Sequence, residues 1–176
     1  MSTWIDFDPL GLVLGGVIGG VVLNLSGVNI TESIKNMFTD KQDTVARTIW
    51  GEARGEGVQG MQAVANVIAN RVLSKRKREF GRGWVGVCKK SQQFSCWNDS
   101  LNNKKNKNAM LSVTSDDLQF AQALTLANDA IDNVLQDITG GATFYHHTTL
   151  SPSWNMSLLE QTAQIGNHKF YKYKGD

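Results

Sequence analysis

Two glutamates, Glu52 and Glu56, lie four residues apart where the apolar pattern of residues 57–76 begins. If residues 49–72 form one amphipathic helix, both carboxylates lie on one face and each raises the proton affinity of the other. A carboxylic acid that is protonated near neutral pH can donate the proton that the leaving oxygen of a glycosidic bond requires. Spacing of this kind is more common in surface pairs, here flanking Arg54, so the spacing alone does not assign catalysis.

Other residue types that often carry chemistry form no recognised motif. The three histidines, His146, His147 and His168, lack an HExxH pattern, and neighbouring residues of a strand point to opposite faces. We therefore expect neither a bound metal nor a cofactor. Serine-nucleophile and phosphate-loop signatures are also absent from the sequence.

Aromatic residues gather in the segments that connect or follow the apolar helical patterns. Their faces suit the apolar faces of sugar rings, and they suit a hydrophobic core equally well. These residues are Phe94, Trp97, Phe144, Tyr145, Trp154, Phe170 and Tyr171.

The composition is that of a folded domain with an appendage. The chain has 176 residues, 41% of them hydrophobic and 19% charged, which is enough for one domain with a core. Residues 1–40 have a net charge of −3, which leaves +5 for residues 41–176. A mildly basic domain suits an anionic polymer such as nucleic acid or bacterial cell wall, and it also suits a plain solvated surface.

Residues 9–31 form an uncharged run that is long enough to cross a bilayer as a helix. Gly11, Gly15 and Gly19 repeat at a spacing that allows close helix packing in membranes. Because the preceding residues are acidic, the run is a poor secretory signal. We expect residues 1–40 to be a glycine-rich apolar arm that contacts a membrane. An arm that docks on another protein and an ordinary buried segment are the alternatives.

The periodicity of residues 41–176 predicts a mostly helical domain, with helices over about residues 40–50, 57–76 and 115–136. Residues 81–110 are rich in Gly, Asn, Ser and Lys and predict a long loop, whereas residues 142–149 and 168–174 predict strands. The expected core positions are Val58, Met61, Val64, Ala65, Ile68, Val72 and Leu73 in the second helix, and Leu118, Ala121, Leu124, Ala127, Ile131, Val134 and Leu135 in the third.

Cys88 and Cys96 are the only cysteines. The absence of a CxxC pattern argues against a structural zinc site. In an oxidising compartment the two residues could form a disulfide that closes a short loop around Gln93 and Phe94. Two separate buried thiols are the alternative.

Five stretches, taken in order, resemble the SleB/CwlJ-type cell wall hydrolase family, which includes spore-cortex-lytic enzymes and bacteriophage endolysins. The similarity covers about residues 42–172, and the GEARGE element with the helix after it is the most specific part. The stretches are ARTIWGEARGEGVQGMQAVANVIANRV (46–72), QQFSCWND (92–99), GATFYHH (141–147), SW (153–154) and IGNHKFY (165–171).

The resemblance implies an α+β, mostly helical, lysozyme-like domain with a small β-sheet over residues 41–176. It implies that Glu52 is the catalytic acid. Gly57 stands where family members often have proline, and the lysine- and asparagine-rich loop of residues 98–114 has no family contacts that can be transferred. The substrate-binding residues that the resemblance and the aromatic pattern suggest are Glu56, Gln93, Phe94, Tyr145, His146, Trp154 and His168.

We therefore expect a glycosidase that cleaves the MurNAc–GlcNAc bond of peptidoglycan, as a lytic transglycosylase or as a muramidase. The rivals are an amidase or peptidase that cuts the peptide stems, and a non-catalytic virion component that binds the wall. The short chain and the glycine-rich arm favour a bacteriophage endolysin or virion-associated lysin acting in the host periplasm or cell wall. Its expected partners are peptidoglycan, a membrane through residues 9–31, and phage structural proteins, without specific binding of nucleic acid.

Overall fold

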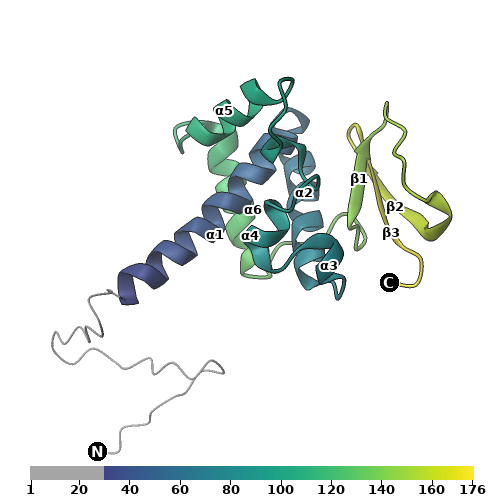
Figure 1. Ribbon diagram of the computed structural model, residues 1–176, viewed down its shortest axis with the longest axis horizontal. Coiled ribbons are helices and arrows are strands. Elements are labelled where there is room, and N and C mark those ends of the chain that lie inside the picture. Colours follow the sequence, from purple (N-terminus) through teal and green to yellow (C-terminus); the bar gives the residue numbers. More distant parts are fainter. Residues whose placement is uncertain (1–29) are drawn as a thin grey trace, which may run out of the picture. The chain divides into compact units, whose positions relative to one another are not determined.

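A computed structural model of the protein describes the backbone of residues 30–176 and the side chains of residues 40–176 (Figure 1). The expected membrane contact of residues 9–31 thus falls almost entirely outside the described residues. Within the described part, no helix has both the length and the apolar character needed to cross a bilayer. Asn36–Asp176 group into one unit by their contacts.

Two long helices carry the glutamates and the apolar pattern that follows them. Helix α1 spans Ile30–Ala53 and α2 spans Gly57–Leu73, with the 3-10 turn η1 (Arg54–Glu56) between them. Helix α1 begins about ten residues earlier than expected, because no glycine or proline interrupts the sequence between residues 30 and 50. Helix α2 ends at Leu73 rather than near residue 76.

The region of residues 81–110 is not the long loop that its composition predicts. The short helix α3 (Lys77–Phe80) precedes it, and it contains α4 (Gly83–Cys88), the 3-10 turn η2 (Ser95–Trp97) and most of α5 (Lys104–Ser112). These helices are short, and α5 contributes a single fully buried residue, Met110. Helices with so few apolar positions leave no clear period in the sequence.

Helix α6 spans Leu118–Ile131 and is shorter than predicted. Asp117 caps its start, because its side chain accepts a hydrogen bond of 2.8 Å from the backbone N–H of Phe120. Beyond the last turn, Asn133 adopts a left-handed backbone conformation (φ 58°), which asparagine tolerates and which ends helices. The buried face consists of Phe120, Ala123, Leu126, Ala127 and Ala130, whereas the expected core residues Leu118 and Val134 are 80% and 71% exposed.

Three antiparallel strands form a small sheet in the order β1-β3-β2 (Figure 1). The two expected strands are β1 (Phe144–His147) and β3 (His168–Tyr173). The strand β2 (Leu159–Ile165), preceded by the 3-10 turn η3 (Met156–Leu158), was not predicted, because its sequence LEQTAQI is mostly polar. The expected class, mostly helical with a small β-sheet, is confirmed.

Helix α2 is buried on two sides. One side joins α1 and α6 in the main core, and the other side, with Ala63 and Val67, packs against Ala142 and Phe170. An apolar helix covered on both sides has a wider buried surface than a single stripe, so the predicted face was incomplete. Of the expected positions, Met61, Val64, Ala65 and Ile68 are buried and Val72 is partly buried, whereas Val58 and Leu73 are 48% and 71% exposed.

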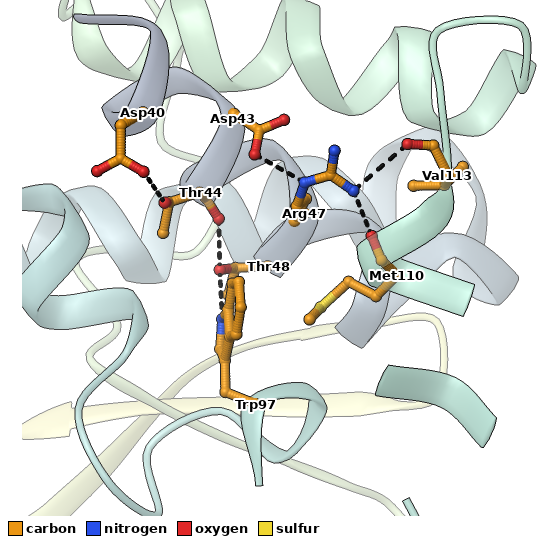
Figure 2. A network of polar contacts seen from close by, with 8 residues as sticks. All are labelled: Asp40, Asp43, Thr44, Arg47, Thr48, Trp97, Met110 and Val113. Carbon is orange, nitrogen blue, oxygen red and sulfur yellow. Dashed lines mark hydrogen bonds and ion pairs between the residues drawn. The ribbon is translucent and has the colours of Figure 1, made fainter. Parts of the chain in front are cut away.

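Polar side chains on α1 hold η2 and α5 in place (Figure 2). Arg47 pairs with Asp43 at 2.7 Å and donates to the carbonyl oxygens of Met110 and Val113 at the end of α5. Thr48 accepts a hydrogen bond of 2.9 Å from the indole N–H of Trp97 in η2. The end of α1 is thereby fixed against both segments.

Gly51 lets α1 approach η2 and α5 closely. A Cβ atom at this position would lie 2.7 Å from Cys96 Cβ and 2.9 Å from Met110 Sδ. Both contacts are too short for a relaxed side chain, so Gly51 is required by packing rather than by its backbone conformation.

We expect Gly51→Ala to lower the free energy of unfolding by about 1–3 kcal/mol, because the added methyl group overpacks the core. Gly55→Ala is the matched control, since a Cβ at Gly55 meets no atom within 4 Å. The control should change stability by no more than about 0.5 kcal/mol. Urea denaturation of both variants measures the difference, and equal stabilities would contradict the packing role of Gly51.

Cys88 and Cys96 are free, buried thiols, so the disulfide considered for an exported protein is not formed. Burial raises the pKa of the Cys88 thiol to about 12. Burial also raises the pKa of Cys96, and the negative charge of Glu52 raises it further. Neither thiol is therefore a reactive nucleophile at neutral pH.

Thiol titration tests this state directly. At pH 8 the native protein should react negligibly, because burial raises the pKa of both thiols and shields them from the reagent. In denaturant without reductant, two thiols per chain should react, and a reduced sample gives the reference. Fewer than two thiols before reduction would show that the cysteines are oxidised.

Candidate active site

Glu52, in the last turn of α1, is held by donors from two other segments. Its Oε1 accepts hydrogen bonds from the backbone N–H of Cys96 at 2.7 Å and from Ser95 Oγ at 3.0 Å, both in η2. Its Oε2 accepts a bond of 2.8 Å from the hydroxyl of Tyr145 in β1. Three elements that are distant in sequence therefore converge on one carboxylate.

Glu52 borders a cavity of about 420 Å³ between η2, β1 and the segment after β1. A larger cavity, of about 690 Å³, lies at the end of α2, where its one carboxylate, Asp176, pairs with Arg76 at 3.3 Å. The smaller cavity, called the cleft below, is the better candidate because it contains the carboxylate held by three donors. Glu52 shares the cleft with Arg71, Gln92, Gln93, Ser95, Asn98, Phe144, Tyr145, His146, His147, Leu150, Trp154 and His168.

Five of the predicted site residues line the cleft together with Glu52: Gln93, Tyr145, His146, Trp154 and His168. Trp154 is fixed by aromatic neighbours, with ring centroids 5.3 Å from Phe144 and 5.7 Å from His146. His146 in turn stacks on Tyr171 at 5.4 Å and shares a hydrogen bond of 3.2 Å with its hydroxyl. This part of the cleft wall is therefore a packed aromatic surface with polar edges, which suits sugar rings.

Phe94 does not line the cleft, because it is only 1% exposed and lies in the core. The guanidinium of Arg71 lies 4.8 Å from its ring centroid. Arg71 is 5% exposed, donates from Nε to the carbonyl oxygen of Thr143 at 2.7 Å, and has no hydrogen-bond partner for Nη1. Burial lowers the pKa of Arg71 to about 10, against the opposing effect of Tyr145 and Glu52, so it stays charged at neutral pH.

Glu56 and Glu52 do not share one helical face. Helix α1 ends at Ala53, whose backbone (φ −138°, ψ 12°) is not helical, and η1 follows, so the α-helix is interrupted between the glutamates. Glu56 Oε2 accepts hydrogen bonds from Asn167, from the backbone N–H at 3.4 Å and from Nδ2 at 3.3 Å. Glu56 borders another, smaller cavity of about 270 Å³ and does not line the cleft. Glu52 borders both this smaller cavity and the cleft.

The pKa values of two cleft residues near Glu52, Tyr145 and His168, are shifted in the direction that favours their uncharged forms. Burial raises the pKa of Tyr145, and the negative charge of Glu52 raises it further. The phenol therefore keeps its proton at neutral pH and donates a hydrogen bond to the Glu52 carboxylate. Burial lowers the pKa of His168, against the opposing effect of Glu56 and with the help of His147. Arg71 supplies a positive charge to the cleft.

The histidines do not gather around a metal position. His146 and His147 both border the cleft, although neighbouring strand residues were expected to point to opposite faces. His147 is the last residue of β1, where its Nδ1 shares a hydrogen bond of 2.7 Å with Thr149. Within residues 40–176 no three His, Cys, Asp or Glu side chains are placed to bind one ion.

Seven cleft residues were not assigned to the site by the sequence analysis, and Ser95, Asn98 and Arg71 are three of them. Ser95 lies within the quoted QQFSCWND stretch, next to the two residues that were chosen, and its hydroxyl contacts Glu52. Asn98 is the second-last residue of the same stretch. Arg71 sits in an otherwise apolar helical pattern, and a charge in the buried face of a helix is the signal that could have identified it.

Comparisons with known proteins agree with this geometry. A family model described as Cell Wall Hydrolase matches residues 55–171. The matched range begins three residues after Glu52. The catalytic domain of the Bacillus cereus SleB protein is similar, with 28% identity and a TM-score of 0.58 over 76% of this chain and 91% of that one. The catalytic domain of a germination-specific lytic transglycosylase, SleB from Bacillus anthracis, matches with 28% identity and a TM-score of 0.57 over 76% and 94%. No curated protein matches the chain.

These findings confirm the resemblance to SleB/CwlJ-type enzymes and the lysozyme-like, mostly helical fold. The family match spans most of the chain and includes the cleft residues of η2, β1 and β3. The chain therefore belongs to the cell wall hydrolase family and is an enzyme of that class.

Proposed function

We propose that this enzyme degrades peptidoglycan by cleaving the glycosidic bond between N-acetylmuramic acid and N-acetylglucosamine, with Glu52 as the catalytic acid. One observation carries the proposal: Glu52 is the single carboxylate among the described residues that line the cleft, and it is held there by three hydrogen bonds. Family membership and the similarity to SleB catalytic domains support the same substrate.

The hydrogen bonds indicate which oxygen of Glu52 transfers the proton. Oε1 already accepts two bonds, and one comes from the backbone N–H of Cys96, which can only donate. Oε2 has the Tyr145 hydroxyl as its partner, and a hydroxyl can either donate or accept. We therefore assign the transferable proton to Oε2. In the first step it passes to the glycosidic oxygen as the bond to C1 of the muramic acid breaks.

The absence of a second carboxylate among the described cleft residues favours a lytic transglycosylase over a muramidase. Glycosidases that hydrolyse through a pair of carboxylates need the second one as nucleophile or as base for water. In a transglycosylase, ionised Glu52 instead takes the proton from the 6-hydroxyl of the muramic acid, whose oxygen then bonds to C1. One carboxylate serves both steps, and the product has an anhydro end.

We expect Glu52→Gln to reduce the clearing of purified sacculi by about 10²- to 10⁴-fold, because the amide cannot donate a proton to the leaving oxygen. Glu160→Gln is the matched control. It makes the same chemical change in β2, away from the cleft, where Glu160 lies 3.5 Å from Lys172.

The same assay decides between enzyme classes. The wild type should release new saccharide ends and no new amino groups. Release of amino groups would instead identify an amidase or peptidase. Retained clearing by a folded Glu52→Gln protein, checked by circular dichroism, would contradict the role of Glu52.

We further propose that the enzyme is a bacteriophage endolysin or virion-associated lysin that reaches the wall from the host periplasm, aided by residues 9–31. The support is the uncharged, glycine-rich composition of this run. Its many glycines suit weak insertion into a membrane, because each one costs about 1 kcal/mol of helix propensity relative to alanine. Weak insertion is what a releasable anchor requires.

Cell fractionation tests this role of the arm. The full chain should appear in the membrane fraction and a version lacking residues 1–31 in the soluble fraction, with the full chain more lytic when expressed inside cells. Both should act equally on isolated sacculi, because the cleft lies beyond residue 40. Equal solubility and equal lysis of the two proteins would refute a membrane role.

A further inference from the structure

Another cavity, of about 470 Å³, lies next to the cleft and is distinct from the cavity at Glu56. Asn98 lines both, so the two spaces meet at this residue. This cavity, called the α5 groove below, lies between the segment after η2 and helix α5. These residues belong to the lysine- and asparagine-rich region for which the family resemblance gives no contacts.

Helix α5 is fixed to the catalytic segment by one of its faces. Asn103, just before the helix, donates to the carbonyl oxygens of Ser95 and Asn98 at 2.7 and 2.8 Å. Asn106 donates to the carbonyl oxygen of Gly51 at 3.2 Å and accepts from Arg54 at 2.6 Å. Because Gly51 precedes Glu52, the helix holds a set position beside the catalytic carboxylate.

The opposite face of α5 lines the groove with residues at helical spacing. Lys104, Lys107 and Leu111 recur at intervals of three and four residues, and Leu101 from the preceding turn joins them. Lys107 is neutralised by Asp99 at 2.6 Å. Lys104 is exposed and has no hydrogen-bond or ion-pair partner within residues 40–176.

The groove combines uncovered apolar surface with one unpaired positive charge. Leu101 is 93% exposed and Leu111 is 51% exposed. Large apolar side chains that gather at a surface cavity mark binding sites more often than they mark ordinary surface. An occupant with small apolar groups and a carboxylate would complement both features.

We propose that the α5 groove binds the peptide stem of the peptidoglycan strand whose glycan lies in the cleft. This inference rests on the proposed function. The stem is attached to the muramic acid, so it must leave the cleft sideways next to the sugar that Glu52 attacks. Its alanine methyl groups suit Leu101 and Leu111, and its carboxylates suit Lys104. A bare glycan chain is rich in hydroxyl groups and offers few such partners.

The test compares two substrates, intact sacculi and glycan strands from which an amidase has removed the stems. The variants are Lys104→Glu and Leu101→Ser. Lys105→Glu is the charge-matched control, since Lys105 is the next residue on the same helix, is exposed and does not line the groove. Leu118→Ser controls for loss of an exposed leucine, because Leu118 is 80% exposed and lies outside the groove.

We expect Lys104→Glu to lower the ratio of activity on stem-bearing to stem-free substrate roughly three- to tenfold, with a rise in the half-saturating amount of sacculi. Leu101→Ser should lower the same ratio in the same direction, and the two controls should keep the wild-type ratio. Because all four positions are exposed, thermal unfolding should be unchanged.

Three results would overturn the inference. Wild-type ratios in both groove variants would show that the groove is not used. Equal losses on both substrates would mean that it holds glycan. An equal loss in Lys105→Glu would mean that only the general charge of α5 matters. If the wild type releases no saccharide ends from either substrate, the proposed function itself fails, which is a distinct outcome.

Discussion

The hydrogen bonds of the Glu52 carboxylate are the interaction on which the rest of the site depends. Its oxygens accept from η2 and from β1, so one side chain at the end of α1 joins the helical part of the domain to the sheet. Glu52 is partly buried, and donors of this kind offset the loss of hydration of a partly buried carboxylate. Two of the segments that line the cleft, η2 and β1, therefore also donate the hydrogen bonds to Glu52.

The surrounding packing keeps these donors at the right distance. Gly51 allows α1 to lie against η2, and Thr48 accepts from Trp97 one turn earlier in the helix. Arg71 adds a buried positive charge that is bound to the backbone at Thr143, immediately before β1. Its attraction to Glu52 and its contacts with aromatic rings offset part of the cost of burying it. The packing of the domain and the position of the Glu52 carboxylate thus depend on overlapping contacts around one helix end.

Sequence reasoning found the parts of this arrangement that leave a local pattern. The apolar period of α2 and the aromatic residues of β1 and β3 were visible, and the family resemblance suggested Glu52, which lies in the cleft. The polar α5 and the edge strand β2 could not be recognised, because neither has an apolar period of its own. Phe94 was assigned to the site by its motif, although packing against Arg71 places it in the core.

The contacts that define the site could not be derived from the sequence for a related reason. The bond between Glu52 and Tyr145 joins residues 93 positions apart, and only the folded chain brings them together. The separation of Glu52 from Glu56 depends on the end of α1 at Ala53, whose backbone (φ −138°, ψ 12°) is not helical, and on the 3-10 turn η1 that follows. Local spacing predicted a shared helical face, whereas in the folded chain Glu52 lines the cleft and Glu56 does not, and the two glutamates border only the cavity of about 270 Å³ together.

Digestion of sacculi in oxygen-18-labelled water, followed by mass spectrometry of the products, tests the single-carboxylate account most directly. When the 6-hydroxyl of the muramic acid attacks C1, no oxygen from solvent enters the product. The account therefore predicts unlabelled anhydro ends as the main product of the wild-type enzyme. Reducing ends that carry one labelled oxygen would contradict it, because they would show that water attacks and that a further group must activate this water.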